Sequence, residues 1–397
     1  MSSLLLGYHV AVLLFLVGAM CMVVANLTCF DGLRDGARFG PEAPLVSILV
    51  PARNEALNIE ACVRSLLAQD YPNWELLVLD DHSEDETSAI LRGLGVSPSG
   101  EQARLLEGAP LPVGWTGKGW ACHQLSQQAR GSFLFFVDAD TTHAPGTVRA
   151  AVDYALRTRA DLVSAWPRLI TKTWSEKLII PMIVVLGMSL YPHWLVILLQ
   201  RFPRLNTLFP ARLRRVLGAA NGQFMFFTRT GYDRIGGHAA LRDHVVEDVA
   251  LGRAVAARSG EGMRLRNCES QNFSTCRMYR SFGEVWEGFT KNLRAVFEES
   301  LADFLLVGTT QMCCFLLPCL LLFLPVAWKG WIAAQVVLIY LIRLILTVRF
   351  RTSWLGLLLH PVGHALALAI GLNSWRRSAR GGVAWKGRTY EIRVGER

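Results

Sequence analysis

Residues 133–140, Phe-Leu-Phe-Phe-Val-Asp-Ala-Asp, are the stretch that decides the fold of this chain. An unbroken apolar run of this length is typical of a strand that is buried on both faces, as in a parallel sheet. Residues two apart on a strand point to the same side. Asp138 and Asp140 can therefore share one divalent cation, and hard oxygen ligands suit magnesium or manganese. The same pair also fits a plain polar turn after a buried strand.

The alternation of strand and helix extends on both sides of this stretch. Apolar runs at 45–50, 74–79 and 160–165 predict further strands, and 58–69 has apolar residues at helical spacing. This pattern predicts an α/β domain over residues 42–300, with a mainly parallel sheet and helices on both faces. Ligands in such folds bind beyond the carboxyl ends of the strands, where Asp80 and Asp81 also lie.

Apolar segments at both ends of the chain indicate a membrane protein. Of its 397 residues, 52% are hydrophobic and 18% charged, whereas soluble domains have roughly 25% charged residues. Residues 4–25 contain no charge and predict an N-terminal transmembrane anchor, rather than a cleaved signal peptide. Arg34 and Arg38 follow it, so the positive-inside rule predicts that the α/β domain is cytoplasmic. The further apolar segments predict a multi-pass membrane protein. Residues 304–372 hold three more apolar segments, and 373–397 form a basic tail.

Two apolar segments are not expected to cross the bilayer as single spans. The block 178–199 lies between the acidic motifs and the rest of the domain, so one crossing would divide the site between two sides of the membrane. We expect it to lie in the interface or to form a re-entrant hairpin bent at Pro181 and Pro192. The last segment, 354–372, contains two histidines and a proline. We expect it to be an incomplete span, which keeps the basic tail on the cytoplasmic side.

Charge and cysteine usage exclude several other classes. The net charge is +9, but no long basic run or aromatic-basic pattern points to nucleic acid. Anionic headgroups or a nucleotide phosphate fit this charge better. None of the nine cysteines forms a Cys-x-x-Cys pair, so a disulfide framework or a zinc site is not expected. We expect the histidines at 82, 123, 143, 238 and 244 to lie on the surface or in polar loops.

Five motifs occur in an order that resembles glycosyltransferase family 2, whose catalytic domain has the GT-A fold. They are Pro51-Ala52-Arg53-Asn54-Glu55, the segment Asp-Asp-His-Ser-Glu-Asp-Glu-Thr at 80–87, Gly117-Lys118-Gly119, Asp138-Ala139-Asp140, and Glu-Asp-Val-Ala-Leu-Gly-Arg at 247–253. Within the family, the membrane layout is similar to that of carotenoid-, hopanoid- and ceramide-type lipid glycosyltransferases. Segments at 218–224, 277–280, 287–292 and 385–390 add to this likeness.

The resemblance implies a role for each matching residue. Asp248, with Glu247 beside it, corresponds to the catalytic base. The other implied roles are donor binding by Pro51, Arg53, Glu55, Asp80, Asp81, Lys118 and Asp138; metal binding by Asp138 and Asp140; and the acceptor side, formed by Gly222, Gln223, Arg277 and Arg280.

The implied reaction is an inverting transfer from a UDP-sugar to the hydroxyl of a membrane lipid, a carotenoid, hopanoid or sphingolipid, with Mg or Mn. Two alternatives stay open. A processive polysaccharide synthase carries Gln-x-x-Arg-Trp after the base, where this chain has Arg277-Met278-Tyr279-Arg280 and no following Trp. An inactive, membrane-anchored nucleotide-sugar-binding protein would be expected to have lost one of the three acids at 138, 140 and 248. The sequence does not name the sugar, the lipid or the oligomeric state.

Overall fold

The structure is a computed structural model that describes residues 2–297, 300–378, 383–385 and 388–390. The chain folds into two compact units. The sheet unit comprises Cys29–Ile170 and His193–Met278, and the helical unit comprises the N-terminal helix, Thr171–Pro192 and the chain from Tyr279 onward. Residues 178–192 of the apolar block 178–199 thus belong to the helical unit and residues 193–199 to the sheet unit, with the boundary after Pro192.

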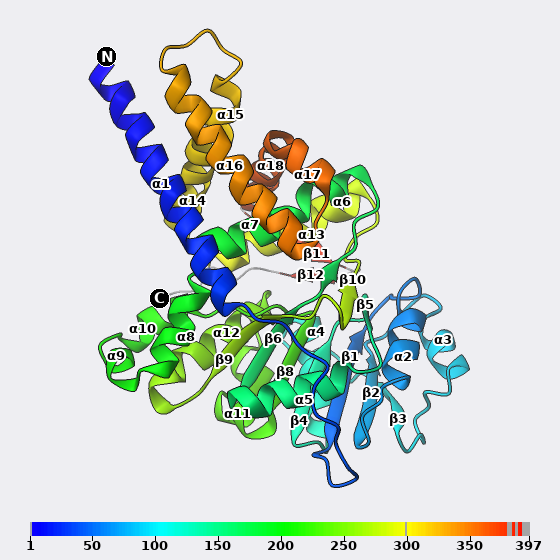
Figure 1. The fold of residues 1–397 in the computed structure, drawn as a ribbon. Coiled ribbons are helices and arrows are strands. Elements are labelled where there is room, and N and C mark those ends of the chain that lie inside the picture. The colour runs from blue at the N-terminus through cyan, green and yellow to red at the C-terminus, as the bar shows by residue number, and fades with distance from the viewer. Residues whose placement is uncertain (1, 298–299, 379–382, 386–387, 391–397) are drawn as a thin grey trace. The chain divides into compact units, whose positions relative to one another are not determined.

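A seven-stranded sheet forms the centre of the sheet unit (Figure 1). The strand order is β3-β2-β1-β4-β8-β6-β9. All neighbouring strands pair in parallel except β8, which runs antiparallel to both β4 and β6. The mainly parallel sheet expected from the sequence is confirmed. The strand bounds are β1 Val46–Ala52, β2 Trp74–Asp80, β3 Ala103–Glu107, β4 Phe133–Val137, β6 Leu162–Trp166, β8 Phe224–Thr228 and β9 Leu265–Glu269.

Helices cover both faces of this sheet. Successive side chains of its strands point to opposite faces, so each face carries apolar side chains that a layer of helices buries. On β4, Phe135 belongs to one hydrophobic cluster and Phe136 to the other. The first cluster includes residues of α2 (Ile59–Leu67), α3 (Thr87–Gly93) and α5 (Thr147–Thr158). The second includes residues of α4 (Gly117–Gln128), α11 (Arg229–Arg234) and α12 (Glu247–Ala257). Continuous apolar strands are thus explained by burial on both sides.

Shorter elements complete the sheet unit. A three-stranded sheet has the order β5-β10-β7, with β5 Thr141–His143, β10 Ser274–Cys276 and β7 Arg168–Leu169. Three helices occupy the stretch between β7 and β8 that belongs to this unit: α8 His193–Arg201, α9 Pro203–Thr207 and α10 Ala211–Leu217. Two 3-10 helices, Gly237–Leu241 and Arg258–Glu261, flank α12.

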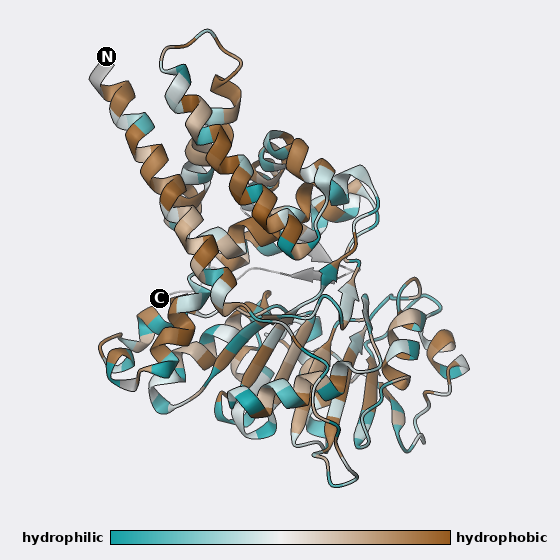
Figure 2. Cartoon of the chain, viewed as in Figure 1, coloured by the Kyte–Doolittle hydropathy of each residue, from teal (hydrophilic) through white to brown (hydrophobic). Residues whose placement is uncertain are grey.

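The helical unit contains the apolar helices, which Figure 2 colours largely brown. Among the described residues, three helices are long and apolar enough to span a membrane: Leu4–Cys29, Leu301–Leu321 and Lys329–Phe350. The pair Trp174–Leu190 and His193–Arg201 adds a fourth only if the two broken halves count as one span. The helix bounds are α1 Ser2–Cys29, α6 Trp174–Ile179, α7 Pro181–Leu190, α13 Phe282–Val296, α14 Leu301–Gln311, a π-helix Met312–Leu316, α15 Leu317–Leu321 and α16 Lys329–Phe350.

The last apolar segment is divided into two helices, α17 (Trp354–Leu358) and α18 (His360–Ser378). Arg343 of α16 is 1% exposed and donates to the carbonyl of Gly356 in α17 at 2.8 Å. Its charge is therefore held inside the helical unit. The tail that follows contains a β-hairpin of β11 Val383–Trp385 and β12 Arg388–Tyr390. Residues 379–382, 386–387 and 391–397 of the expected basic tail lie outside the described residues.

Candidate active site

Three charged side chains from three elements meet at the carboxyl end of β4. Asp138 follows the last residue of β4, Lys118 lies in the first turn of α4, and Glu247 is the first residue of α12. The Lys118 Nζ is 2.7 Å from Asp138 Oδ1 and 2.9 Å from Glu247 Oε1. Burial acts to lower the pKa of Lys118, but the carboxylates of Asp138 and Glu247 raise it well above its usual value. Lys118 is therefore protonated and joins two of the sequence motifs.

Negative charge still exceeds positive charge at this point. Burial, Asp138 and Glu55 raise the pKa of Asp140 to about 7. The Asp140 Oδ1 is buried and has no hydrogen-bond partner. An unsatisfied buried carboxylate oxygen is costly unless a cation or donor fills the place. The pair Asp138 and Asp140 therefore fits a divalent cation.

The protein alone does not supply a complete set of metal ligands here. Among the described residues, no group of three or more His, Cys, Asp or Glu side chains is placed to hold an ion. This agrees with the chemistry of Mg²⁺, which binds through one or two carboxylates and keeps waters and substrate phosphates as its other ligands.

Asp248 is held in one orientation by backbone donors. Its Oδ2 accepts from the Gly222 N–H at 2.7 Å and its Oδ1 from the Val249 N–H at 2.8 Å. Burial and the neighbouring Glu247 raise its pKa to about 6, although both backbone hydrogen bonds act to lower it. A carboxylate with a pKa near the working pH can accept a proton and release it again. The geometry therefore suits Asp248 for general-base chemistry.

Gly222 matters because of its distance from Asp248. A Cβ at position 222 would lie 3.0 Å from Asp248 Oδ2 and 3.2 Å from its Cβ. Contacts this short force one of the two groups to move. The neighbouring Gln223 is 7% exposed, and its N–H and Oε1 both bond to the Asn221 side chain. The segment 221–223 is thus a fixed loop against the candidate base.

Hydrogen bonds join the first two motifs, residues 51–55 and 80–87, into one surface. The Arg53 Nη1 donates to the carbonyls of Asp81, at 2.6 Å, and His82, at 3.1 Å. Asn54 and Ser83 also bond across the gap at 3.0 Å. Asn54 and His82 have φ values of 51° and 55°, the left-handed conformation that lets both loops turn sharply. The structure therefore brings together the segments that the sequence assigned to donor binding.

Within this surface, Pro51, Glu55 and Asp80 support the loops. Pro51 lies in β1, paired with β2. The Glu55 N–H donates to Thr87 Oγ1 at 2.8 Å. Asp80 Oδ1 accepts from the Ser83 N–H at 3.0 Å, and Oδ2 accepts from the Ser88 hydroxyl. Asp80 thus shapes the loop with both carboxylate oxygens, a use that the motif alone did not indicate.

The two arginines expected on the acceptor side fall in different units. Arg277 follows β10 in the sheet unit, and its N–H donates to the Asp140 carbonyl at 3.3 Å. Arg280 belongs to the helical unit, where its N–H donates to Glu284 Oε2 at 2.8 Å. A shared acceptor role for these two residues stays a prediction.

Two histidines differ from expectation. His143 and His238 are 5% and 1% exposed, so their predicted surface location is wrong. The His143 ring bonds to Thr141 and the His238 ring to Tyr232, and burial lowers their pKa values to about 3 and about 4. Both are neutral packing residues.

The sequence also missed two cysteines beside the acidic pair. The Cys62 Sγ donates to the Asp138 carbonyl at 3.8 Å, and the Cys276 thiol hydrogen-bonds to the Asp140 side chain. Both thiols are buried, and burial raises their pKa values, so they are uncharged. They pack around the carboxylates without adding charge. Nothing in their spacing along the chain pointed to this position.

Comparison with known proteins shows that this chain is similar to glycosyltransferases. Residues 47–228 match the model of glycosyl transferase family 2, and residues 206–397 match that of glycosyl transferase family 21. A 4,4'-diaponeurosporenoate glycosyltransferase of Staphylococcus aureus (strain MRSA252) is 27% identical over 362 residues, which cover 87% of this chain and 88% of the relative.

A solved structure shares the fold. The mannosyltransferase PcManGT from Pyrobaculum calidifontis, in complex with GDP-Man and Mn²⁺, aligns with a TM-score of 0.50 at 18% identity. The alignment covers 94% of this chain and 97% of that structure. At this identity, the likeness shows the fold alone.

Proposed function

We propose that this chain, whose residues 47–228 match the model of glycosyl transferase family 2, transfers a sugar, with inversion, from a UDP-sugar to the hydroxyl of a membrane lipid. The observation that carries this proposal is the half-buried, backbone-held carboxylate of Asp248 beside the cluster of Lys118, Asp138 and Asp140. One carboxylate placed to take a proton, next to a centre that suits a diphosphate, is what a single displacement at the anomeric carbon requires.

The step at the acceptor is a proton transfer. The acceptor hydroxyl gives its proton to Asp248 as its oxygen attacks the anomeric carbon, and the bond from that carbon to the UDP oxygen breaks. The hydrogen bonds from Gly222 and Val249 fix the direction in which Asp248 presents its free lone pairs. With a single base and a single displacement, the product has the inverted configuration.

The departing UDP gains negative charge, which this chain can stabilise. Lys118 is protonated, partly exposed and tied to Asp138. A donor diphosphate competes with Asp138 and Glu247 for its ammonium group. A divalent cation, Mg or Mn, held by Asp138 and Asp140 would supply further charge stabilisation for the leaving diphosphate. Arg53, Asp81 and the joined loops around them are proposed to hold the uridine.

A carotenoid-type lipid is the acceptor that the comparisons favour. The relative from Staphylococcus aureus is named for 4,4'-diaponeurosporenoate, and the two chains align over most of their lengths. The three helices that could span a membrane keep this chain at a bilayer, where such a lipid is dissolved. Arg34 and Arg38 favour, under the positive-inside rule, a sheet unit on the cytoplasmic side, where nucleotide sugars are available.

The experiment is a donor and acceptor matrix with the purified full-length protein in lipid nanodiscs. UDP-glucose, UDP-galactose, UDP-N-acetylglucosamine and GDP-mannose are each paired with hydroxylated carotenoid, hopanoid and sphingolipid, with Mg²⁺ or Mn²⁺ present. We expect a UDP-sugar to give a glycosylated carotenoid by mass spectrometry, with the inverted anomer by NMR. A retained anomer, a product with GDP-mannose alone, or a growing polysaccharide would contradict the proposal.

A further inference from the structure

The sheet unit carries an exposed surface whose composition the transfer reaction does not explain. Residues 201–217, Arg-Phe-Pro-Arg-Leu-Asn-Thr-Leu-Phe-Pro-Ala-Arg-Leu-Arg-Arg-Val-Leu, contain five arginines and no acid. No Asp or Glu occurs anywhere between Lys177 and Tyr232. Such a one-sided charge over a short stretch is unusual in a chain with 41 basic and 32 acidic residues.

This stretch exposes arginine side chains as well as large apolar side chains. Phe202, Leu208, Leu213 and Val216 are 50%, 76%, 44% and 57% exposed. The exposed arginines lie among them, at positions 201, 204, 212 and 215. We call these eight residues the basic-apolar patch. A helix surface that mixes Arg with Phe and Leu is typical of elements that lie in the headgroup region of a membrane.

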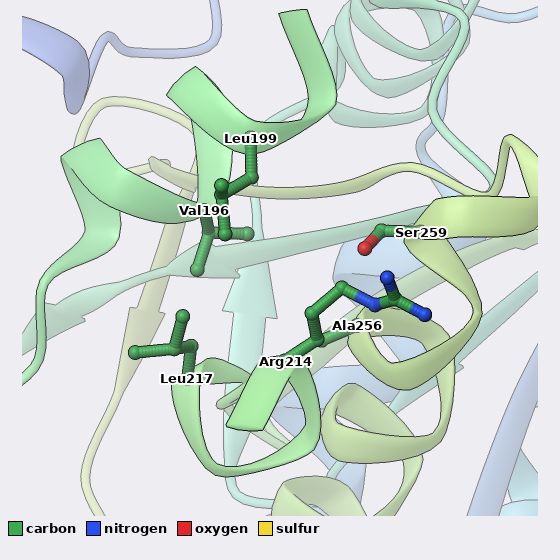
Figure 3. A pocket seen from close by; sticks show the side chains of 6 residues that line it. All are labelled: Val196, Leu199, Arg214, Leu217, Ala256 and Ser259. Atoms are coloured by element: carbon green, nitrogen blue, oxygen red, sulfur yellow. The ribbon is translucent and has the colours of Figure 1, made fainter. Parts of the chain in front are cut away.

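The patch rests on a firmly packed base. The fifth arginine, Arg214, turns inward, and its Nη1 donates to the carbonyls of Asn206, at 3.0 Å, and Phe209, at 2.8 Å. Figure 3 shows Arg214 with Val196 and Leu199 of α8, Leu217 of α10, and Ala256 and Ser259, around a small cavity. The inner side of α10 is therefore occupied by protein, and its outer side is open.

Within the described part of the chain, Arg201, Arg204 and Arg212 of the patch form no ion pair with acidic groups of the neighbouring elements. α10 packs against α12 and the 3-10 helix Arg258–Glu261. The acids of α12 are Glu247 and Asp248, which belong to the site described above. Glu261 pairs with Arg234, with an Nη2 to Oε2 distance of 3.3 Å. The positive charge of these three arginines is thus available to an external anion.

We propose that the basic-apolar patch docks the sheet unit onto an anionic phospholipid surface, with its arginines on headgroup phosphates and Phe202, Leu208, Leu213 and Val216 among the upper acyl chains. Charge complementarity selects this occupant, and the helices that could span a membrane keep a bilayer within reach of the same chain. Each arginine near an anionic surface shifts the ratio of docked to free forms about fivefold. Such docking does not depend on which sugar or lipid acceptor the enzyme uses.

Docking would also bear on the candidate base. α10 ends at Leu217 and leads directly into Gly218, which packs closely on α12: a Cβ there would lie 2.7 Å from the Gly252 carbonyl oxygen. The chain then reaches Gly222, whose N–H holds Asp248. A lipid surface that steadies α10 therefore steadies the segment that orients the base.

The test uses the full-length protein in nanodiscs of phosphatidylcholine alone or with phosphatidylglycerol added. Leu213 is replaced by the photo-crosslinker p-benzoylphenylalanine, and the matched control carries it at Leu156, an exposed apolar position of α5 that is 52% exposed. We expect position 213 to label lipid severalfold more than position 156, to gain labelling with phosphatidylglycerol, and to lose it in high salt, which screens the attraction.

Charge reversal distinguishes the arginines from the apolar contacts. In the Leu213 crosslinker background, Arg204→Glu with Arg212→Glu should lower the ratio of docked to free protein at least about 20-fold, from two steps of about fivefold, and lipid labelling should fall with the docked fraction. Arg92→Glu with Arg159→Glu makes the same change in net charge elsewhere on the sheet unit and should leave labelling within twofold of the parent. Equal labelling at 213 and 156, labelling indifferent to phosphatidylglycerol, or patch-dependent binding of a fluorescent oligonucleotide without lipid labelling would each overturn the proposal. Since the readout is lipid contact, failure of the transfer assay leaves it unaffected.

Discussion

Gly222→Ala should impair the candidate base while leaving the fold intact. The new Cβ would lie 3.0 Å from Asp248 Oδ2 and 3.2 Å from Asp248 Cβ, both closer than ordinary van der Waals contact. The carboxylate or the loop must therefore shift by a few tenths of an ångström, which stretches the 2.7 Å hydrogen bond from the Gly222 N–H. Misplacement of about 1 Å at a reacting group can cost about 100-fold in rate.

Two readouts follow from this geometry. We expect kcat to fall about 3- to 10-fold, or about 0.7–1.4 kcal/mol in activation free energy, with the KM for the nucleotide sugar nearly unchanged. Because the Gly222 hydrogen bond lowers the pKa of Asp248, its weakening should also move the acidic limb of the pH profile to higher pH.

The assay measures initial rates of radiolabelled sugar transfer into lipid across a pH series. Gly93→Ala is the matched control, because a Cβ at Gly93 would meet nothing within 4 Å. A Gly222→Ala variant with kcat within twofold of wild type and an unmoved acidic limb would refute the role assigned to this contact.

Three further predictions concern charge at the site. In the wild-type enzyme, kcat/KM should rise about tenfold per pH unit up to about pH 6 and then level off, because Asp248 must be ionised to accept a proton; a flat profile between pH 4.5 and 6 would exclude it as the base. Lys118→Met should lower kcat/KM about 100-fold, since it removes the cation between Asp138 and Glu247, with Lys118→Arg retaining more activity; equal rates in the two variants would show that charge is not what Lys118 supplies. A chelator should abolish transfer, and Asp140→Asn should raise the concentration of Mn²⁺ needed for half-maximal activity; undiminished turnover in excess chelator would contradict the metal site.

The parts of the fold that the sequence predicted are those with strong local signals. The strands that became β1, β2 and β4 are apolar apart from Ser47, Glu75 and Asp80, because both of their faces are covered. β3 was missed because it lies at the edge of the sheet and carries Arg104 and Glu107 among its apolar residues. β8 was missed although Phe224–Thr228 is a buried apolar run like β4, and only its place between β4 and β6 depends on pairing between strands distant in sequence, which no local pattern encodes.

The candidate site was likewise predicted only in part from the sequence. Motif order identified the residues that meet at the strand ends, and Lys118 and Asp138 do make contact. It could not show that both carboxylate oxygens of Asp80 accept hydrogen bonds from its own loop, or that the Gly222 N–H donates to the Asp248 carboxylate. Those facts follow from three-dimensional packing. They are also the ones that turn a set of motif residues into a mechanism.

The central claim is tested most directly by Asp248→Asn, which keeps the size of the side chain but removes its capacity to take a proton. Sugar transfer into lipid and binding of the UDP-sugar, by calorimetry, are measured on the same preparation of the full-length protein. A general base contributes about 10²- to 10⁴-fold to rate, so we predict a loss of transfer in that range with the donor Kd within twofold of wild type. Transfer within tenfold of wild type in the Asp248→Asn variant would contradict the account.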